Sequence, residues 1–197
     1  MPMASSPGMQ IPQQLMSLPN QLTIGRILAI PGICLFVVIG WEWLRWLALL
    51  LYIAAAITDW LDGFLARRMN LNSALGKMLD PIADKLLVGA LIVTFAWTRD
   101  FSGWDLIPAI AILIREIFVS GLREYLGNRS IEVPVTFLAK WKTTAQLVSL
   151  ALIMAAPMLL GLGFFAHAFL WIAAALTVWT GWEYLRSTWP HLAGPEI

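Results

Sequence analysis

Residues 59–67 read Asp-Trp-Leu-Asp-Gly-Phe-Leu-Ala-Arg, and residues 76–85 read Gly-Lys-Met-Leu-Asp-Pro-Ile-Ala-Asp-Lys. These two segments place four carboxylates in a strongly apolar chain: Asp59, Asp62, Asp80 and Asp84. The members of the first pair are three residues apart and those of the second are four apart, so each pair shares one face of an α-helix. The polar residues 67–73 predict a turn between two antiparallel helices, which would bring all four acids together.

Four carboxylates in so small a space repel one another unless a cation neutralises them. Mg²⁺ and Mn²⁺ prefer carboxylate oxygens and keep water or phosphate oxygens as further ligands. The sequence therefore predicts a metal site, with room for two ions, whose candidate ligands are Asp59, Asp62, Asp80 and Asp84. The alternative is that each acid caps a helix or pairs with a nearby base: Arg67, Lys77 or Lys85.

The composition is typical of a polytopic membrane protein. Hydrophobic residues make up 59% of the 197 residues and charged residues 13%, about half the charged share of a soluble domain. The formal net charge is only +1 and the chain has no run of basic residues, so we expect no nucleic-acid partner. The single cysteine excludes an internal disulfide.

The apolar segments predict an all-α integral membrane protein with six transmembrane helices, since a span needs about 20 residues. The expected helices cover residues 21–40, 43–68, 76–98, 106–127, 136–159 and 164–186. Residues 1–10 are expected to be disordered, and residues 11–18 to form a short interfacial helix. Residues 11–197 are then a single six-helix transmembrane catalytic domain.

The basic residues predict the orientation of the helices. One end of the expected bundle collects Arg26, Arg67, Arg68, Lys77, Lys85, Arg123, Arg129, Lys140, Lys142 and Arg186. The opposite end holds only Arg45 and Arg99. By the positive-inside rule the first end, which also carries the four acids, faces the cytosol.

The acidic segments also match a family pattern, D-x2-D-G-x2-A-R-x8-G-x3-D-x3-D. Its fixed positions are Asp59, Asp62, Gly63, Ala66, Arg67, Gly76, Asp80 and Asp84. This pattern resembles that of the CDP-alcohol phosphatidyltransferases, which are integral membrane enzymes of phospholipid synthesis with their own fold. The resemblance implies that CDP-diacylglycerol is bound by Asp59, Asp62, Gly63, Ala66, Arg67 and Gly76. It also supports Mg²⁺ or Mn²⁺ as the cofactor and Asp84 as the catalytic general base.

A second set of charges suggests a pocket for an anion: Arg115, Arg123, Lys140 and Lys142. A charge at the centre of a membrane span costs about 2.5–3.5 kcal/mol on insertion scales, so such residues mark function. Arginine forks and lysine point charges both suit phosphate oxygens.

The alternative for this set is structural. Arg115 and Arg123 would then pair with the acids that follow them, Glu116 and Glu124, and the lysines would bind lipid headgroups. Residues adjacent in a helix do not face each other, so we expect those pairs to be poor. Arg115 could meet Asp84 instead.

Residues 18–26, 115–124 and 140–143 are similar to those of family members that use glycerol 3-phosphate as the acceptor. The resemblance implies that the phosphatidyl group of CDP-diacylglycerol is transferred to sn-glycerol 3-phosphate, giving phosphatidylglycerophosphate and CMP. The acceptor's phosphate would lie on Arg115, Arg123, Lys140 and Lys142, with Thr23 and Arg26 as further candidates. The resemblance further implies a homodimer in the bacterial inner membrane, surrounded by membrane lipids, with the active site facing the cytosol.

Other functions remain open. Within the family, the acceptor could be inositol phosphate, serine or phosphatidylglycerol. A basic pocket favours a phosphorylated acceptor, and inositol phosphate fits that charge equally well. In a cation transporter, the acids would line an ion route. Here they gather near one end, and the outer halves of the helices are apolar. A non-catalytic scaffold would need no complete acid set.

Overall fold

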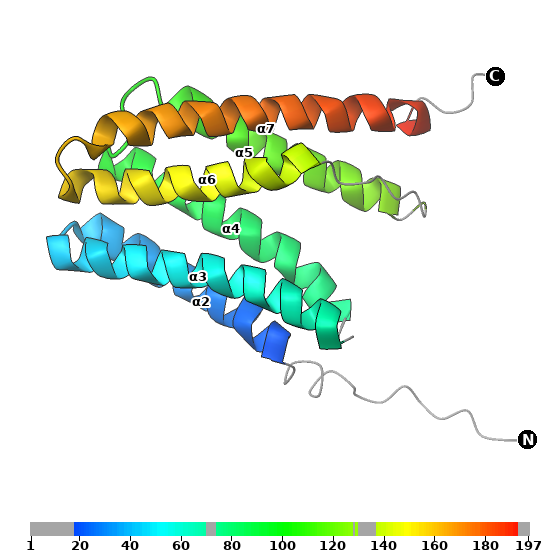
Figure 1. The fold of residues 1–197 in the computed structure, drawn as a ribbon, viewed down its shortest axis with the longest axis horizontal. Coiled ribbons are helices and arrows are strands. Elements are labelled where there is room, and N and C mark those ends of the chain that lie inside the picture. The colour runs from blue at the N-terminus through cyan, green and yellow to red at the C-terminus, as the bar shows by residue number, and fades with distance from the viewer. Residues whose placement is uncertain (1–17, 70–73, 128, 130–136, 193–197) are drawn as a thin grey trace, which may run out of the picture.

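The computed structural model describes residues 18–69, 74–127, 129 and 137–192, and within these residues the fold is all-helical. The long helices are α2 (Leu18–Ile39), α3 (Glu42–Met69), α4 (Ala74–Thr98), α5 (Leu106–Gly127), α6 (Phe137–Ala155) and α7 (Leu162–Leu192) (Figure 1). A 3₁₀ turn, η1 (Ala156–Met158), follows α6. The predicted disordered residues 1–10 and nearly all of the predicted interfacial helix at 11–18 lie outside the described residues.

The six expected helices are all present, and the largest differences from expectation lie at three ends. Helix α2 begins at Leu18, three residues before the expected start at residue 21. Helix α6 ends at Ala155, earlier than expected, because Pro157 stands in the first turn of η1. Helix α7 continues to Leu192, past the expected end at Arg186. A charge such as Arg186 marks the edge of an apolar layer and does not stop a helix.

Two of the described helices are long and apolar enough to cross a membrane by length and composition: Asn20–Ile39 of α2 and Leu162–Leu192 of α7. Large apolar side chains also cover the outside of the described bundle, including Trp97, Ile114, Phe164 and Trp179. A soluble surface would carry such residues only singly. The total of six spans stays a prediction.

The helices pack as two groups that α4 joins. Helix α2 packs against α3 and α4, while α7 packs against α5 and α6. Helix α4 crosses between the groups, and α6 also contacts α3 (Figure 1). The core is built from fully buried apolar side chains, among them Ile33, Leu91, Phe95, Leu150, Met154 and Leu170.

Six helix ends meet at one end of the bundle, which we call the site end. There α2, α4 and α6 begin, and α3, α5 and α7 end (Figure 1). At the opposite end, Gly40 with a φ of 77° lies between α2 and α3. Two close polar contacts lie there: Arg45 Nη2 donates to both carboxylate oxygens of Asp100 at 3.0 Å, and His167 Nδ1 lies 2.6 Å from Asp105 Oδ2.

Candidate functional site

Three of the four predicted acids can be located, and they converge on one face of α2. Asp59 lies in the last third of α3, while Asp80 and Asp84 lie one turn apart near the start of α4. Thr23 Oγ1 donates to Asp80 Oδ1 at 2.8 Å. Three residues further along α2, Arg26 Nη1 lies 2.5 Å from Asp59 Oδ1 and 3.2 Å from Asp84 Oδ1.

Arg26 is therefore the counter-ion of the acid cluster. Its side chain is only 1% exposed, whereas those of Asp59 and Asp84 are 39% and 54% exposed. A buried arginine beneath two accessible carboxylates holds one oxygen of each and leaves other lone pairs open. The sequence had offered Thr23 and Arg26 as contacts of glycerol 3-phosphate, but in the structure both bond to the acids.

Several residues of the predicted site lie outside the described side chains. The side chains of Asp62, Ala66, Arg67 and Lys140, and the surroundings of Gly63, lie outside the described part of the chain, so their roles stay predictions. Gly76 lies in the first turn of α4, close to the acids in sequence. Lys85 was an alternative partner for an acid, but its Nζ donates to the carbonyl oxygen of Pro81 at 2.7 Å.

The carboxylate oxygens suit a hard divalent cation as ligands, although the described side chains alone do not form a complete metal site. No group of three or more His, Cys, Asp or Glu residues is placed to hold a metal among the described residues, which omit the Asp62 side chain. Asp59 and Asp84 share one nitrogen of Arg26 and line the same small cavity of about 80 Å³. All the donors are carboxylate oxygens, as Mg²⁺ and Mn²⁺ prefer.

A larger cavity of about 840 Å³ joins the acids to the predicted basic set. It opens between α4, α5 and α6 at the site end. Its charged lining consists of Asp80, Asp84, Lys85, Arg115, Glu116, Arg123, Glu124 and Lys142. Three of the four predicted phosphate-binding residues thus face the same space as two of the acids, and Lys85 adds a base that the prediction had left out.

Glu116 organises the basic side of this cavity. Its Oε1 accepts hydrogen bonds from Arg115 Nη1 at 3.3 Å, from Gln146 Nε2 at 3.2 Å and from Lys142 Nζ. The expectation that Arg115 and Glu116 pair poorly was wrong: both side chains are long enough for Arg115 Nη1 to reach Glu116 Oε1, although the two residues are neighbours in the helix. Glu116 itself was missed as a site residue, although an acid inside an expected span was a signal for it.

Arg123 lines the same cavity and contacts α7. Its guanidinium carbon lies 5.8 Å from the centre of the Tyr184 ring, within the range of a cation–π contact. Arg123 is otherwise exposed, so its charge remains available to an anion in the cavity.

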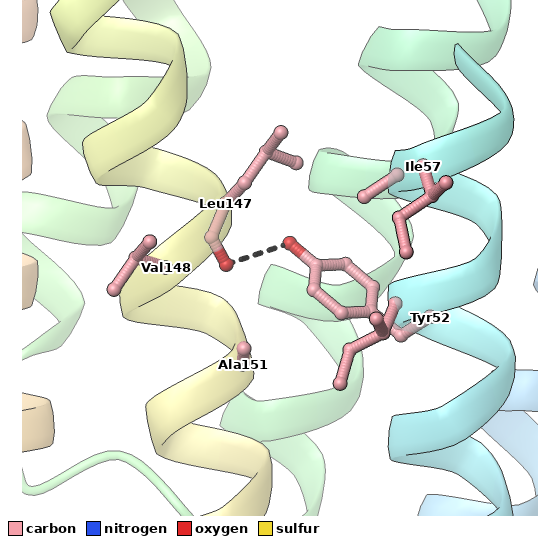
Figure 2. Close-up of a pocket in the computed structure, with 7 residues that line it drawn as sticks. Tyr52, Ile57, Leu147, Val148 and Ala151 are labelled. Atoms are coloured by element: carbon pink, nitrogen blue, oxygen red, sulfur yellow. Dashed lines mark hydrogen bonds between the residues drawn. The ribbon is translucent and has the colours of Figure 1, made fainter. Parts of the chain in front are cut away.

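An apolar groove lies beside the acids, between α3 and α6. It has a volume of about 310 Å³ and is lined by Tyr52, Ile53, Ala56, Ile57, Leu147, Val148 and Ala151. The Tyr52 hydroxyl donates to the carbonyl oxygen of Leu147 at 2.9 Å and so links the two helices (Figure 2). Ala56 and Leu147 also line the small cavity with Asp59 and Asp84, so the groove adjoins the polar site.

The sequence is similar to those of known proteins. The sequence profile of the CDP-alcohol phosphatidyltransferase family matches residues 16–179. A protein of Rickettsia bellii is 45% identical over 174 residues, covering 87% of this chain and 94% of the relative. Proteins of Cereibacter sphaeroides and Pseudomonas fluorescens are each 39% identical, covering 89% and 90% of this chain and 97% and 92% of their own lengths. All three are named CDP-diacylglycerol–glycerol-3-phosphate 3-phosphatidyltransferase. The chain belongs to the CDP-alcohol phosphatidyltransferase family.

Proposed function

We propose that this protein transfers the phosphatidyl group of CDP-diacylglycerol to sn-glycerol 3-phosphate, giving phosphatidylglycerophosphate and CMP. The observation that carries the proposal is the 840 Å³ cavity, which has Asp80 and Asp84 on one side and Arg115, Arg123 and Lys142 on the other. Acids with a divalent ion suit a diphosphate donor, and a basic wall suits an acceptor that carries a phosphate of its own. The names of the relatives support the same reaction.

On the donor side, Asp59 and Asp80 would hold Mg²⁺ or Mn²⁺, with Asp62 and Asp84 as further candidate ligands. The ion supplies neutralisation of charge on the diphosphate oxygens. Arg26, on α2, bonds to one oxygen of Asp59 and one of Asp84 and so holds both carboxylates in place. They therefore need not reorganise when CDP-diacylglycerol binds.

On the acceptor side, the basic wall would bind the phosphate of glycerol 3-phosphate. Arg115 and Lys142 each donate one hydrogen bond to Glu116. Their remaining N–H groups can donate to phosphate oxygens. Lys140 remains a further candidate.

Asp84 is the proposed general base. It lines both the cavity with the basic wall and the smaller one with Asp59, so it stands between the two substrates. The acceptor hydroxyl oxygen attacks the phosphatidyl phosphorus, the bond from that phosphorus to the CMP oxygen breaks, and the hydroxyl proton passes to Asp84. CMP leaves with the electron pair of the broken bond.

The apolar groove between α3 and α6 would hold an acyl chain of the donor. Its lining is almost wholly hydrocarbon, and it meets the polar site at Ala56 and Leu147. A lipid whose headgroup lies on the acids could therefore lay one chain along α3 and α6.

We place the protein in a bacterial inner membrane, with six helices crossing it and the site end facing the cytosol. The clustering of basic residues at that end and the apolar outer surface support this orientation. A homodimer is a further proposal, which cross-linking in native membranes would test.

An acceptor panel tests the reaction. Purified protein is given CDP-diacylglycerol and Mg²⁺, and CMP release is measured with glycerol 3-phosphate, inositol phosphate, serine, phosphatidylglycerol or glycerol. We expect glycerol 3-phosphate to give the highest kcat/KM. If inositol phosphate gave the higher kcat/KM, the basic wall would still bind the acceptor's phosphate, but the acceptor would be inositol phosphate. A higher kcat/KM with serine would contradict the phosphate pocket.

A further inference from the structure

The backbone of α7 closes on Arg115 at Gly181. A Cβ atom at position 181 would lie 2.8 Å from Arg115 Cγ, 3.2 Å from Nε and 3.6 Å from Cδ. Real Cβ atoms essentially never approach another heavy atom within 3.0 Å. The nearest atom is Cγ in the stem of the side chain, so a larger residue would force the whole side chain aside.

This contact is specific to Gly181. Among the described glycines, the next closest approach is at Gly89, where a Cβ would lie 3.4 Å from a Leu113 methyl group. Gly163, on the same helix, would meet nothing within 4 Å. The glycine at position 181 is therefore explained by the close approach of Arg115.

The neighbouring residue fixes the end of the same side chain. Arg115 Nη2 donates to Thr180 Oγ1 at 3.3 Å. Thr180 is buried, and its hydroxyl donates in turn to carbonyl oxygens of α7, with Leu176 O at 2.8 Å. The acceptor oxygen for Arg115 is thus held rigidly by the backbone of α7.

Two further nitrogen atoms of Arg115, Nη1 and Nε, lie in different surroundings. Nη1 donates to Glu116, while Nε is buried and has no hydrogen-bond partner among the described residues. Nε lies against Gly181, so the guanidinium meets α7 along its inner edge and keeps the remaining N–H groups of its terminal nitrogens for the cavity.

We infer that α7 supports the acceptor pocket through its contact with Arg115, and that Gly181 and Thr180 are positioning residues that aim Arg115 at the acceptor's phosphate. This inference rests on the proposed function, because it assigns Arg115 to that phosphate. It gives a role to the last helix, on which the sequence alone offered no site residue.

Substitution of Gly181 tests the inference. Gly181→Ala should raise the KM for glycerol 3-phosphate at least about tenfold, because a displacement near 1 Å at a binding group can cost that much or more. The KM for CDP-diacylglycerol should change less than about twofold, since α7 packs chiefly on α5 and α6, whereas the donor-site acids lie on α3 and α4. Gly163→Ala is the matched control on the same helix and should keep both values near wild type.

A double-mutant cycle separates positioning from general damage. In an Arg115→Ala background there is no long side chain to displace, so adding Gly181→Ala should leave the KM for glycerol 3-phosphate unchanged within about twofold. A further rise in that background would overturn the inference, because it would show that the methyl group acts through helix packing. A neutral Gly181→Ala single variant would also overturn it.

Thr180→Val gives a second test that does not depend on a steric clash. It keeps the shape but removes the oxygen that Nη2 contacts, and it should raise the KM for glycerol 3-phosphate about threefold or more. Thr94→Val is the control, because Thr94 Oγ1 donates to the carbonyl of Ala90 on its own helix. An unchanged KM in Thr180→Val would count against the inference. Wild-type protein that releases no CMP with glycerol 3-phosphate would instead contradict the proposed function.

Discussion

One nitrogen atom of Arg26 lies between two carboxylates from different helices, 2.5 Å from Asp59 Oδ1 and 3.2 Å from Asp84 Oδ1. This contact ties α2, α3 and α4 together at the site end. Asp59 and Asp84 can lie close together because the buried guanidinium of Arg26 neutralises them. Their other carboxylate oxygens face the cavities.

Removing the Arg26 charge should destabilise the site end. Arg26→Gln is expected to lower the free energy of unfolding by about 1–3 kcal/mol, the range for a lost hydrogen bond to a charged group. Thermal unfolding in detergent with a chelator measures this. Mg²⁺ should then raise the Tm of the variant more than that of the wild type, because the ion replaces the missing cation. Arg186→Gln, at an exposed position, is the control, and an equal Mg²⁺ effect in all three proteins would contradict the arrangement.

Asp84→Asn should abolish turnover but not donor binding. The amide cannot accept the acceptor's proton, so kcat should fall at least about 100-fold. Equilibrium binding of CDP-diacylglycerol in the presence of Mg²⁺ should be largely kept. A variant with near-normal kcat would show that Asp84 is not the base.

Lys142→Met should affect the acceptor and not the donor. Its ammonium lies at the cavity wall beside Glu116, and the substitution removes the charge while keeping the length of the side chain. The KM for glycerol 3-phosphate should rise at least about tenfold, as expected for a lost charge-assisted hydrogen bond. Initial rates with each substrate varied in turn measure the two KM values. Equal increases in both would contradict the phosphate pocket.

Filling the apolar groove should discriminate between donors by chain length. Ala151→Phe places a ring in the groove between α3 and α6, where burial of each methylene contributes about 0.8 kcal/mol. The KM should rise for a dipalmitoyl donor and change little for a dioctanoyl donor. Ala175→Phe, on the exposed face of α7, is the control. If the variant treated both donors as the wild type does, the acyl chain would lie elsewhere.

The helices and the acid cluster could be predicted from the sequence because both depend on local spacing. Runs of apolar residues fix the helices, and the gaps between the aspartates fix their shared faces. The partners of the charges could not be predicted, because they depend on how helices distant in sequence pack. Arg26 thus turned out to pair with the acids, and Glu116 with a lysine on another helix.

Gly181 is the clearest case of this limit. Within the sequence it is an ordinary small residue in an apolar helix, and only the packing of α7 on α5 shows that Arg115 needs the space. The apolar groove could not be predicted from the sequence for the same reason, since its two sides come from residues 52–57 and 147–151, which are far apart in the chain.

We propose that the aspartates at the site end bind a divalent ion together with the donor's diphosphate. Mn²⁺ binding to the purified protein, followed by electron paramagnetic resonance with and without CDP-diacylglycerol, tests it most directly. We predict bound Mn²⁺ in the wild type, tighter with the donor present, and its loss in the Asp59→Asn, Asp80→Asn double variant. Wild-type protein that binds no Mn²⁺, or a double variant that binds it equally well, would contradict the account.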